Sequence, residues 1–226
     1  MNTNTENQEN MGLDRKDQSQ VKISSYTAQG KIEELKAALN EGLDAGLTLN
    51  EINETLVQLY AYCGFPKSLN GITSFMDVVN ERKGKGIRDE QGKEIVMNDG
   101  VEDKYEKGRK VLEELTKMPQ SKPAPGFGEF SPRIDAFLKE HLFADIFASD
   151  VLSYRQRKLI TNAALASMPG AESQLAAHLF MGMNVGLTAA SLEELFSIIE
   201  TTVGKDAATE GRNILQSLLQ MRNNSK

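Results

Sequence analysis

The sequence feature that most constrains the fold is an internal repeat, in which residues 30–64 match residues 170–204 at a constant offset of 140. Ten positions are identical: Gly30/Gly170, Leu35/Leu175, Ala37/Ala177, Leu39/Leu179, Gly42/Gly182, Gly46/Gly186, Leu47/Leu187, Thr48/Thr188, Glu54/Glu194 and Gly64/Gly204. Glycine favours a helix C-terminus and threonine the next N-cap, so two similar helical hairpins would explain part of this identity. The length of the match, which one gap extends back to Leu13 and Leu152, favours a duplication.

The hydrophobic pattern predicts an all-α fold. Apolar residues recur along one helix face of the first copy: Ile32, Leu35, Leu39 and Leu43. Thr48 and Glu51 have the spacing of a capping box ahead of the next helix, which Gly64 and Pro66 are expected to end. Further helices are predicted near residues 67–82, 104–117, 153–167, 171–185, 191–202 and 205–222. No segment alternates with period two, so no sheet is expected.

Composition divides the chain into four parts. We expect a disordered tail (1–12), a first helical unit (13–82), a charged and proline-rich connector (83–130) and a second unit (131–222). Residues 81–110 carry 17 charged side chains and are predicted to be solvated. Residues 119–132 hold four of the six prolines and are predicted to be extended along a surface. Ser131 and Pro132 are expected to open the next helix as N-cap and first residue.

Charge and residue counts exclude several classes of function. The net charge of −6 argues against nucleic acid as the main partner. No apolar stretch is long enough to span a bilayer, and the polar N-terminus lacks the pattern of a signal peptide, so we expect a cytoplasmic protein without a membrane partner. A single cysteine excludes an intrachain disulfide and a CxxC pair, and with only two histidines no metal site or metal cofactor is expected.

Five short motifs, three in the second unit and two in the first, resemble those of a known family. The second unit contains Leu152-Ser-Tyr-Arg-Gln-Arg-Lys-Leu-Ile, Gln174-Leu-Ala-Ala-His and Gly186-Leu-Thr, and the first contains Gly46-Leu-Thr-Leu-Asn-Glu-Ile and Tyr60-Ala-Tyr-Cys-Gly-Phe-Pro. Together they resemble the carboxymuconolactone decarboxylase family over about residues 13–80 and 130–215. The resemblance implies two alkylhydroperoxidase D-like helical units in tandem, in an oligomer. It also implies decarboxylase chemistry without metal or organic cofactor, or, in another branch, peroxide reduction by a CxxC pair and a histidine.

His178 is the first candidate for a catalytic residue, because the resemblance places it on the family's histidine. An imidazole can accept and donate a proton near neutral pH. The alternative is a hydrogen-bonded core histidine, since His178 follows Leu175 by three positions on the inner helix face. Apolar neighbours, among them Phe180, would make a surrounding pocket favourable for decarboxylation. The first unit has Ala38 at the matching position, so only the second unit can use this group.

The other candidates are charged residues that could bind the substrate. Arg155 and Arg157 match the family's paired arginines, and guanidinium groups can hold a carboxylate in a bidentate grip. The alternative is a solvated first turn of a helix. Glu194 is the predicted catalytic partner of His178 or of an arginine. Its repeat equivalent, Glu54, belongs to a candidate first-unit site, and either glutamate could instead be a surface group or pair with an arginine at an interface between units.

The peroxidase branch requires two thiols, seven and four residues before the histidine. Those positions hold Ala171 and Gln174 in the second unit and Lys31 and Glu34 in the first. Cys63, which completes the candidate first-unit site, lies elsewhere and is expected to be a small packing residue. The sequence therefore disfavours a thiol peroxidase.

These observations favour a cofactor-free lyase or isomerase acting on a small carboxylated, lactone-like molecule. A peroxidase-type oxidoreductase and a non-catalytic binding protein are the alternatives. Units of about 70 ordered residues are too small to bury all of their apolar helix faces alone. We therefore expect a homo-oligomer, a trimer of tandem chains, with a monomer as the alternative.

Overall fold

The computed structural model describes residues 12–95 and 103–224, and within these ranges the chain is helical throughout, with no strand. The first unit contains α2 (Arg15–Gln29), α3 (Ile32–Asp44) and α4 (Leu49–Gly84). The second contains α8 (Tyr154–Ala166), α9 (Glu172–Asn184), α10 (Ala189–Thr202) and α11 (Lys205–Asn224). Between them lie α5 (Lys104–Thr116), α6 (Phe127–Phe130), α7 (Pro132–Ala136) and the π-helix η1 (Phe137–Ile146). None of the described helices is long and apolar enough to cross a lipid bilayer.

The two units repeat the same backbone conformation where their sequences match. Helices α3 and α9 have 13 residues each, with Ala38 and His178 at the same position along them. The turn glycines Gly46 and Gly186 both have positive φ, at 93° and 99°. Only glycine adopts this conformation without strain, so it explains why the glycine recurs in the Gly-Leu-Thr turn. The predicted capping box is present, with Glu51 N donating to Thr48 Oγ1 and Thr48 N donating to Glu51 Oε2.

Helix α4 reverses direction at Gly64, where φ is 82° and ψ is 159°. The second half packs back on the first, because the Ser68 hydroxyl donates to the Leu56 carbonyl at 2.8 Å and a Cβ on Gly71 would lie 2.9 Å from the Leu56 side chain. In the second unit, Gly211 lies against Phe196 in the same way, after the reversal between α10 and α11. These contacts are also related by the offset of 140, which supports the duplication. The predicted end of the helix at Gly64 is confirmed.

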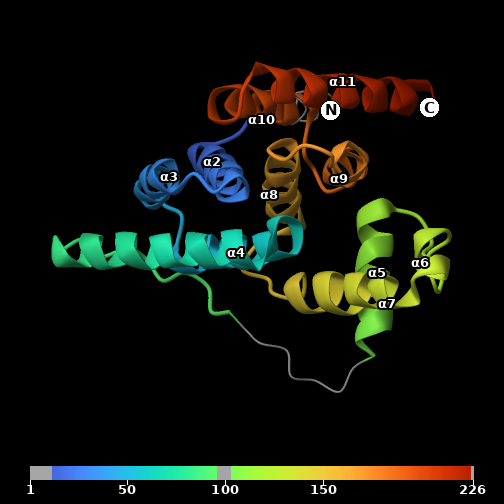
Figure 1. Ribbon diagram of the computed structural model, residues 1–226, viewed down its shortest axis with the longest axis horizontal. Helices are drawn as coiled ribbons and strands as arrows, with labels where there is room; N and C mark the ends of the chain where they lie inside the picture. Colours follow the sequence, from blue (N-terminus) through green and yellow to red (C-terminus); the bar gives the residue numbers. More distant parts are fainter. Residues whose placement is uncertain (1–11, 96–102, 225–226) are drawn as a thin grey trace, which may run out of the picture.

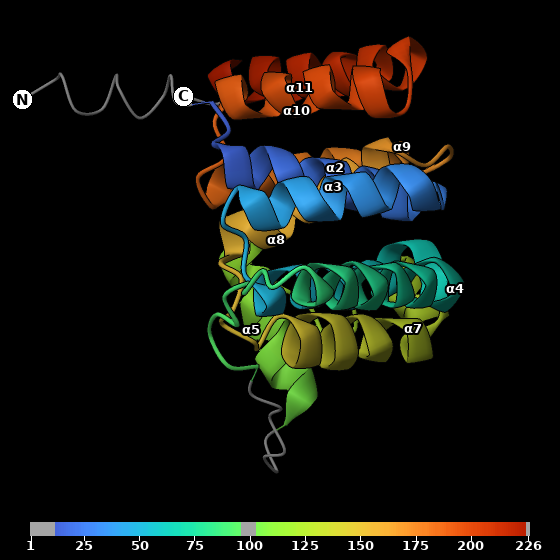
Figure 2. The same cartoon turned by 90° about the vertical axis from the view of Figure 1, so that its left-hand side faces the viewer.

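The two units share one core. Helix α2 packs against α8, while α10 of the second unit packs on α2 and α4 of the first packs on α8. Figure 1 shows α8 upright between these helices, and Figure 2 shows the successive layers. The buried side chains of Leu13 and Val21 join a cluster formed by α8 to α11, and Leu59 joins a cluster with Ile160 of α8. Residues of both units are therefore available to build one site.

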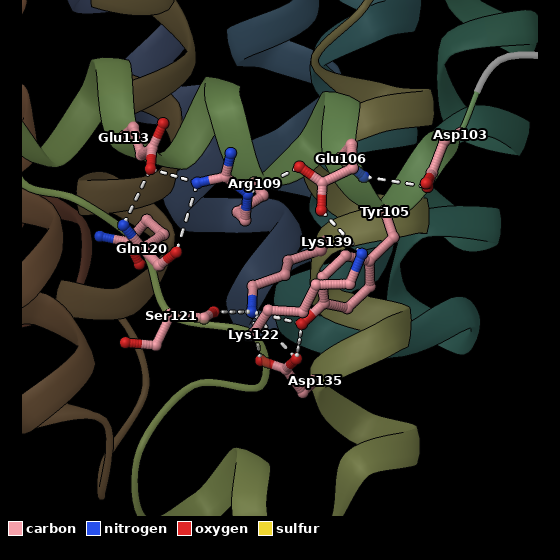
Figure 3. A network of polar contacts seen from close by, with 10 residues as sticks. All are labelled: Asp103, Tyr105, Glu106, Arg109, Glu113, Gln120, Ser121, Lys122, Asp135 and Lys139. Atoms are coloured by element: carbon pink, nitrogen blue, oxygen red, sulfur yellow. Dashed lines mark hydrogen bonds and ion pairs between the residues drawn. The ribbon is translucent and has the colours of Figure 1, made fainter.

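The segment between the units has a packing role in addition to the connecting role predicted for it. Helix α5 lies against η1 so closely that a Cβ on Gly108 would come within 1.8 Å of the Lys139 carbonyl oxygen. Leu115 is fully buried there. Beside this contact, polar side chains form the network drawn in Figure 3, in which Lys139 is bound to Asp135 and Tyr105. The proline-rich stretch is not extended throughout, since it contains α6, and Pro132 opens α7 although Ser131 makes no side-chain cap.

Candidate functional site

The candidate site is centred on His178, in the middle of α9. Its imidazole is partly exposed, and its Nδ1 lies 3.4 Å from Nζ of Lys158 on α8. The ring of Tyr62, at the end of the first half of α4, meets the imidazole edge-on with 5.5 Å between centroids. Helices of both units thus contribute to one site, because α4 and α9 both pack against α8.

Lys158 is the most unusual residue of this site, because its side chain is fully buried. Its ammonium lies over two aromatic rings, 5.2 Å from the centroid of Phe143 in η1 and 4.7 Å from that of Phe147 directly after η1. Among the described residues no carboxylate forms an ion pair with it. Burial, together with the charge of neighbouring Arg157, lowers the pKa of Lys158 to about 7. Near neutral pH the amine is therefore present in both protonation states.

The other two titratable groups of the site are held neutral. Burial and the charge of Lys158 lower the pKa of His178 well below its ordinary value, so the imidazole is uncharged at neutral pH. Burial raises the pKa of Tyr62 to about 12. The Tyr62 hydroxyl is buried and finds no hydrogen-bond partner among the described residues. A neutral base and an unpartnered donor lie side by side at this site.

Arg157 lies on the same helix but is bound within the protein. Its Nη2 donates to Glu54 Oε2 at 2.9 Å and to the Ser149 carbonyl at 2.7 Å, and its Nη1 donates to Gln58 Oε1 at 2.9 Å. The side chain is fully buried, and its guanidinium also lies over Phe147. The predicted pairing of a repeat glutamate with an arginine between units is therefore seen for Glu54. Arg157 fixes α8 against α4 and does not present this edge to a ligand.

Arg155 points to a different neighbour. Its Nη1 donates to Asp17 Oδ2 of α2 at 2.7 Å, and its side chain is 31% exposed. Burial raises the pKa of Asp17, and the hydrogen bond from Arg155 opposes this effect. No described contact brings Arg155 and His178 together.

Glu194 is on α10, and its carboxylate contacts the start of α2 and not His178. Its Oε2 accepts from the Leu13 backbone N–H at 2.7 Å, and its Oε1 accepts from Gln18 Nε2 at 2.8 Å. Gln18 matches Arg157 in the repeat, as Glu194 matches Glu54. The Glu54–Arg157 and Glu194–Gln18 contacts are thus equivalent contacts between the units. The first joins two charged groups, and the second joins a carboxylate to a neutral amide.

Cys63 is a partly buried packing residue next to Tyr62. Its thiol donates to the Leu59 carbonyl at 3.2 Å, and burial raises its pKa. Both features disfavour a reactive thiolate. The candidate first-unit site is not assembled by these contacts, because Glu54 is bound to Arg157 and Cys63 to Leu59. No group of three metal-ligating side chains occurs in the part of the chain that the structure describes.

Sequence reasoning missed Lys158 and Tyr62. The sequence signal for Lys158 is its place directly after Arg157 and before an apolar run, where a helix turn is buried on more than one face. Tyr62 precedes the Cys-Gly-Phe-Pro stretch that ends the first half of α4. Neither residue had a partner in the nearby sequence that would have indicated its role.

The comparisons with known proteins agree with this architecture. The model of the carboxymuconolactone decarboxylase family matches residues 2–73 and 132–217, which together form more than half of the chain. The first matched segment covers α2, α3 and most of α4, and the second covers α7 and η1 together with α8, α9, α10 and most of α11. Among curated proteins, no sequence matches the chain.

Proposed function

The chain belongs to the carboxymuconolactone decarboxylase family, and from this premise we propose that it is a cofactor-independent lyase or isomerase with His178 as its proton-transfer group. The proposed substrate is a small carboxylated, lactone-like molecule. One observation carries the proposal: a partly exposed, uncharged imidazole lies 3.4 Å from the buried amine of Lys158. An uncharged imidazole can accept a proton from carbon or oxygen.

The surroundings of His178 suit the loss of a carboxylate. Phe143, Phe147 and Tyr62 provide an apolar wall, and a carboxylate moved against it loses hydration. When the C–C bond breaks, its electron pair stays on the substrate as an enolate while CO2 leaves. The imidazole then donates its ring proton to the enolate carbon and takes a proton from the Lys158 ammonium in return. The ammonium form of Lys158 would stabilise the developing negative charge.

The remaining candidates receive supporting roles in this proposal. Arg157 and Glu54 hold α8 against α4 and so fix the position of Lys158. Arg155, which keeps an exposed edge, is the proposed partner of the substrate carboxylate. Glu194 positions the start of α2. These assignments place the chemistry at the second unit's histidine, with the first unit supplying Tyr62.

The test is an assay for CO2 release from small carboxylated lactones, comparing His178→Ala with His141→Ala. His141 is the matched control, because it is the chain's second histidine and is exposed beside Asp145. Loss of general base catalysis is expected to reduce kcat by about 10²–10⁴-fold in His178→Ala alone. Equal activity of the two variants would refute the role of His178.

A non-catalytic binding protein is the second candidate function. The observation that favours it is the replacement of the histidine by Ala38 in the first unit, which leaves that unit without a proton-transfer group. Binding of a carboxylated lactone to wild-type protein without CO2 release or isomerisation would support this alternative.

We further propose that the working form is a homotrimer. The second half of α4 presents exposed apolar side chains along one side: Phe65, Leu69 and Met76 are 62%, 55% and 57% exposed. A second group, formed by Phe127, Phe130, Ile134 and Phe137, is exposed on α6, α7 and the start of η1. Such faces are typical of contacts between subunits. Light scattering after gel filtration would contradict the trimer if the mass were that of one 24.9 kDa chain.

A further inference from the structure

Two lysines are fully buried in the part of the chain that the structure describes, and of these two Lys158 lacks an oxygen acceptor. Lys139 binds both carboxylate oxygens of Asp135, the Tyr105 hydroxyl and the Ser121 carbonyl. Lys158 has one hydrogen-bond partner among the described residues, the imidazole of His178. Burying an ammonium without a counter-charge is costly, and the protein avoids that cost by releasing the proton. A buried amine without its proton is a nucleophile.

We propose that Lys158 forms an imine with the carbonyl group of a small keto acid. This inference goes beyond the proposed function, because it assigns a covalent intermediate to a residue other than His178. Three features of the geometry carry it: the amine lies over the Phe143 and Phe147 rings, its neighbour on α8 is the cation Arg157, and an imidazole nitrogen lies 3.4 Å away. A second cation and an apolar surrounding are the two conditions that activate a lysine for this chemistry.

The same geometry indicates the class of ligand. The two aromatic rings give the amine an apolar surrounding, which suits an uncharged carbonyl group. A carboxylate on the same molecule would supply the counter-charge that Lys158 lacks and could accept a hydrogen bond from the unpartnered Tyr62 hydroxyl. His178, the hydrogen-bond partner of the amine, is a partly exposed residue, so a ligand that approaches past this side chain would have to be small.

The chemistry balances without an added oxidant or reductant. The neutral Nζ attacks the carbonyl carbon, and the C=O electron pair moves to oxygen. His178 takes a proton from nitrogen and returns it to this oxygen. A second proton, taken from water through the imidazole, lets the oxygen leave as water, and the C=N bond forms as an iminium. In a β-keto acid, the C–C bond to the carboxylate then breaks, CO2 leaves, and its electron pair passes to the iminium nitrogen to give an enamine. Protonation of carbon and hydrolysis by water release the ketone and restore the amine.

Reductive trapping tests this proposal on the wild-type chain. The protein is incubated at neutral pH with pyruvate or acetoacetate and then with borohydride, whose hydride converts an iminium into a stable secondary amine. Peptide mass spectrometry locates the adduct. At neutral pH an exposed lysine is almost entirely protonated, so we expect at least about tenfold more adduct on Lys158 than on Lys93, which is 58% exposed. Lys139 is the buried control and is expected to remain unmodified.

The outcomes separate this inference from the proposed function. Labelling of Lys93 and other exposed lysines without labelling of Lys158 overturns the imine proposal, whether or not carboxylated lactones are turned over. Labelling at Lys158 that disappears in Lys158→Arg supports it even if those lactones are not substrates. The arginine variant keeps a cation at this position but cannot form an imine, so circular dichroism matching that of wild type would exclude loss of folding as the reason.

Discussion

Lys139 and Lys158 are equally buried, but their surroundings differ in kind. Around Lys139, Tyr105 of α5, Asp135 of α7 and the Ser121 carbonyl provide four oxygen atoms within hydrogen-bond distance, as Figure 3 shows. Around Lys158, the surroundings are the Phe143 ring of η1, the Phe147 ring directly after it, and the imidazole of His178 on α9. The oxygen atoms around Lys139 stabilise its positive charge, whereas the apolar surroundings of Lys158 make the charged form unfavourable. Burial alone therefore does not distinguish the two lysines, whereas the presence or absence of an anionic partner among the described residues does.

The pKa of Asp135, the partner of Lys139, is that expected for a carboxylate in a structural ion pair. Burial acts to raise the pKa of Asp135, but hydrogen bonds from Tyr105 and Lys139 outweigh it, so the pKa lies below its ordinary value. The carboxylate is therefore charged at neutral pH, and it forms an ion pair with Lys139 at 2.9 Å. No such partner opposes the effect of burial at Lys158, where the charges of the neighbourhood act in the same direction as burial.

The largest expected effect comes from replacing each lysine by methionine. Lys139→Met leaves Asp135 buried without its cation and is expected to lower the free energy of unfolding by about 3–5 kcal/mol. Lys158→Met removes an unpaired buried charge and keeps the apolar stem, so it is expected to raise the free energy of unfolding by about 1–3 kcal/mol at or below neutral pH. Urea denaturation measures both. Destabilisation of similar size in the two variants would show that Lys158 is an ordinary structural lysine.

The next effect is a dependence of stability on pH. The pKa of Lys158 is about 7 in the folded chain and near its ordinary 10.5 in the unfolded chain. Between these values the unfolded chain binds the extra proton, so stability rises with pH, by up to about 1.4 kcal/mol per pH unit from this group. The charged or titratable groups that face it are Arg157 on its own helix, His178 on α9 and Tyr62 on α4.

Lys158→Met isolates this contribution, because all other titrations are shared with wild type. We expect the stability difference between wild type and variant to shrink as pH rises from about 7 to about 9. The same experiment on Lys139→Met is the control, and its difference from wild type is expected to stay constant over this range. A constant difference for both variants would place the pKa of Lys158 outside this range.

The features that could be predicted from the sequence depend on residues close together in the chain. The capping box of Thr48 and Glu51 and the reversal at Gly64 follow from local backbone chemistry, and the repeat follows from counting identities. Family membership could be recognised for the same reason, since it depends on short motifs within each unit.

The features that could not be predicted from the sequence depend on which helices pack against each other. Arg157 and Lys158 occupy the first turns of α8, where charged side chains normally reach solvent, yet both are covered because η1 and α4 pack over this end. The π-helix itself and the close approach at Gly108 have no local sequence signal. Glu194 was expected beside His178, but its contacts lie at the start of α2, because α10 packs on α2 in the same way as α4 packs on α8.

A smaller effect is expected when Lys158 is given a carboxylate partner, as Lys139 has in Asp135. In His178→Glu a carboxylate replaces the imidazole, so the pKa of Lys158 should rise and the pH dependence between about 7 and 9 should decrease. Imine trapping at Lys158 should fall with it, because the amine stays protonated. His141→Glu is the matched control at an exposed position and should change neither property. Unchanged trapping in His178→Glu would mean that the imidazole does not govern the state of the amine.

The smallest effect is expected at Cys63, the third group of this region that burial holds in its neutral form. Its thiol contacts only the Leu59 carbonyl among described hydrogen-bond acceptors, and a serine hydroxyl can make the same bond, so Cys63→Ser should change the free energy of unfolding by no more than about 1 kcal/mol. Burial lowers the pKa of Lys158 and raises that of Cys63, so it favours the neutral form of both groups. The neutral form of an amine is the nucleophile, whereas the neutral form of a thiol is unreactive. Cys63→Ser should therefore leave imine trapping and CO2 release unchanged. Turnover of an alkyl hydroperoxide that is present in wild type and lost in Cys63→Ser would instead assign the chemistry of this region to sulfur.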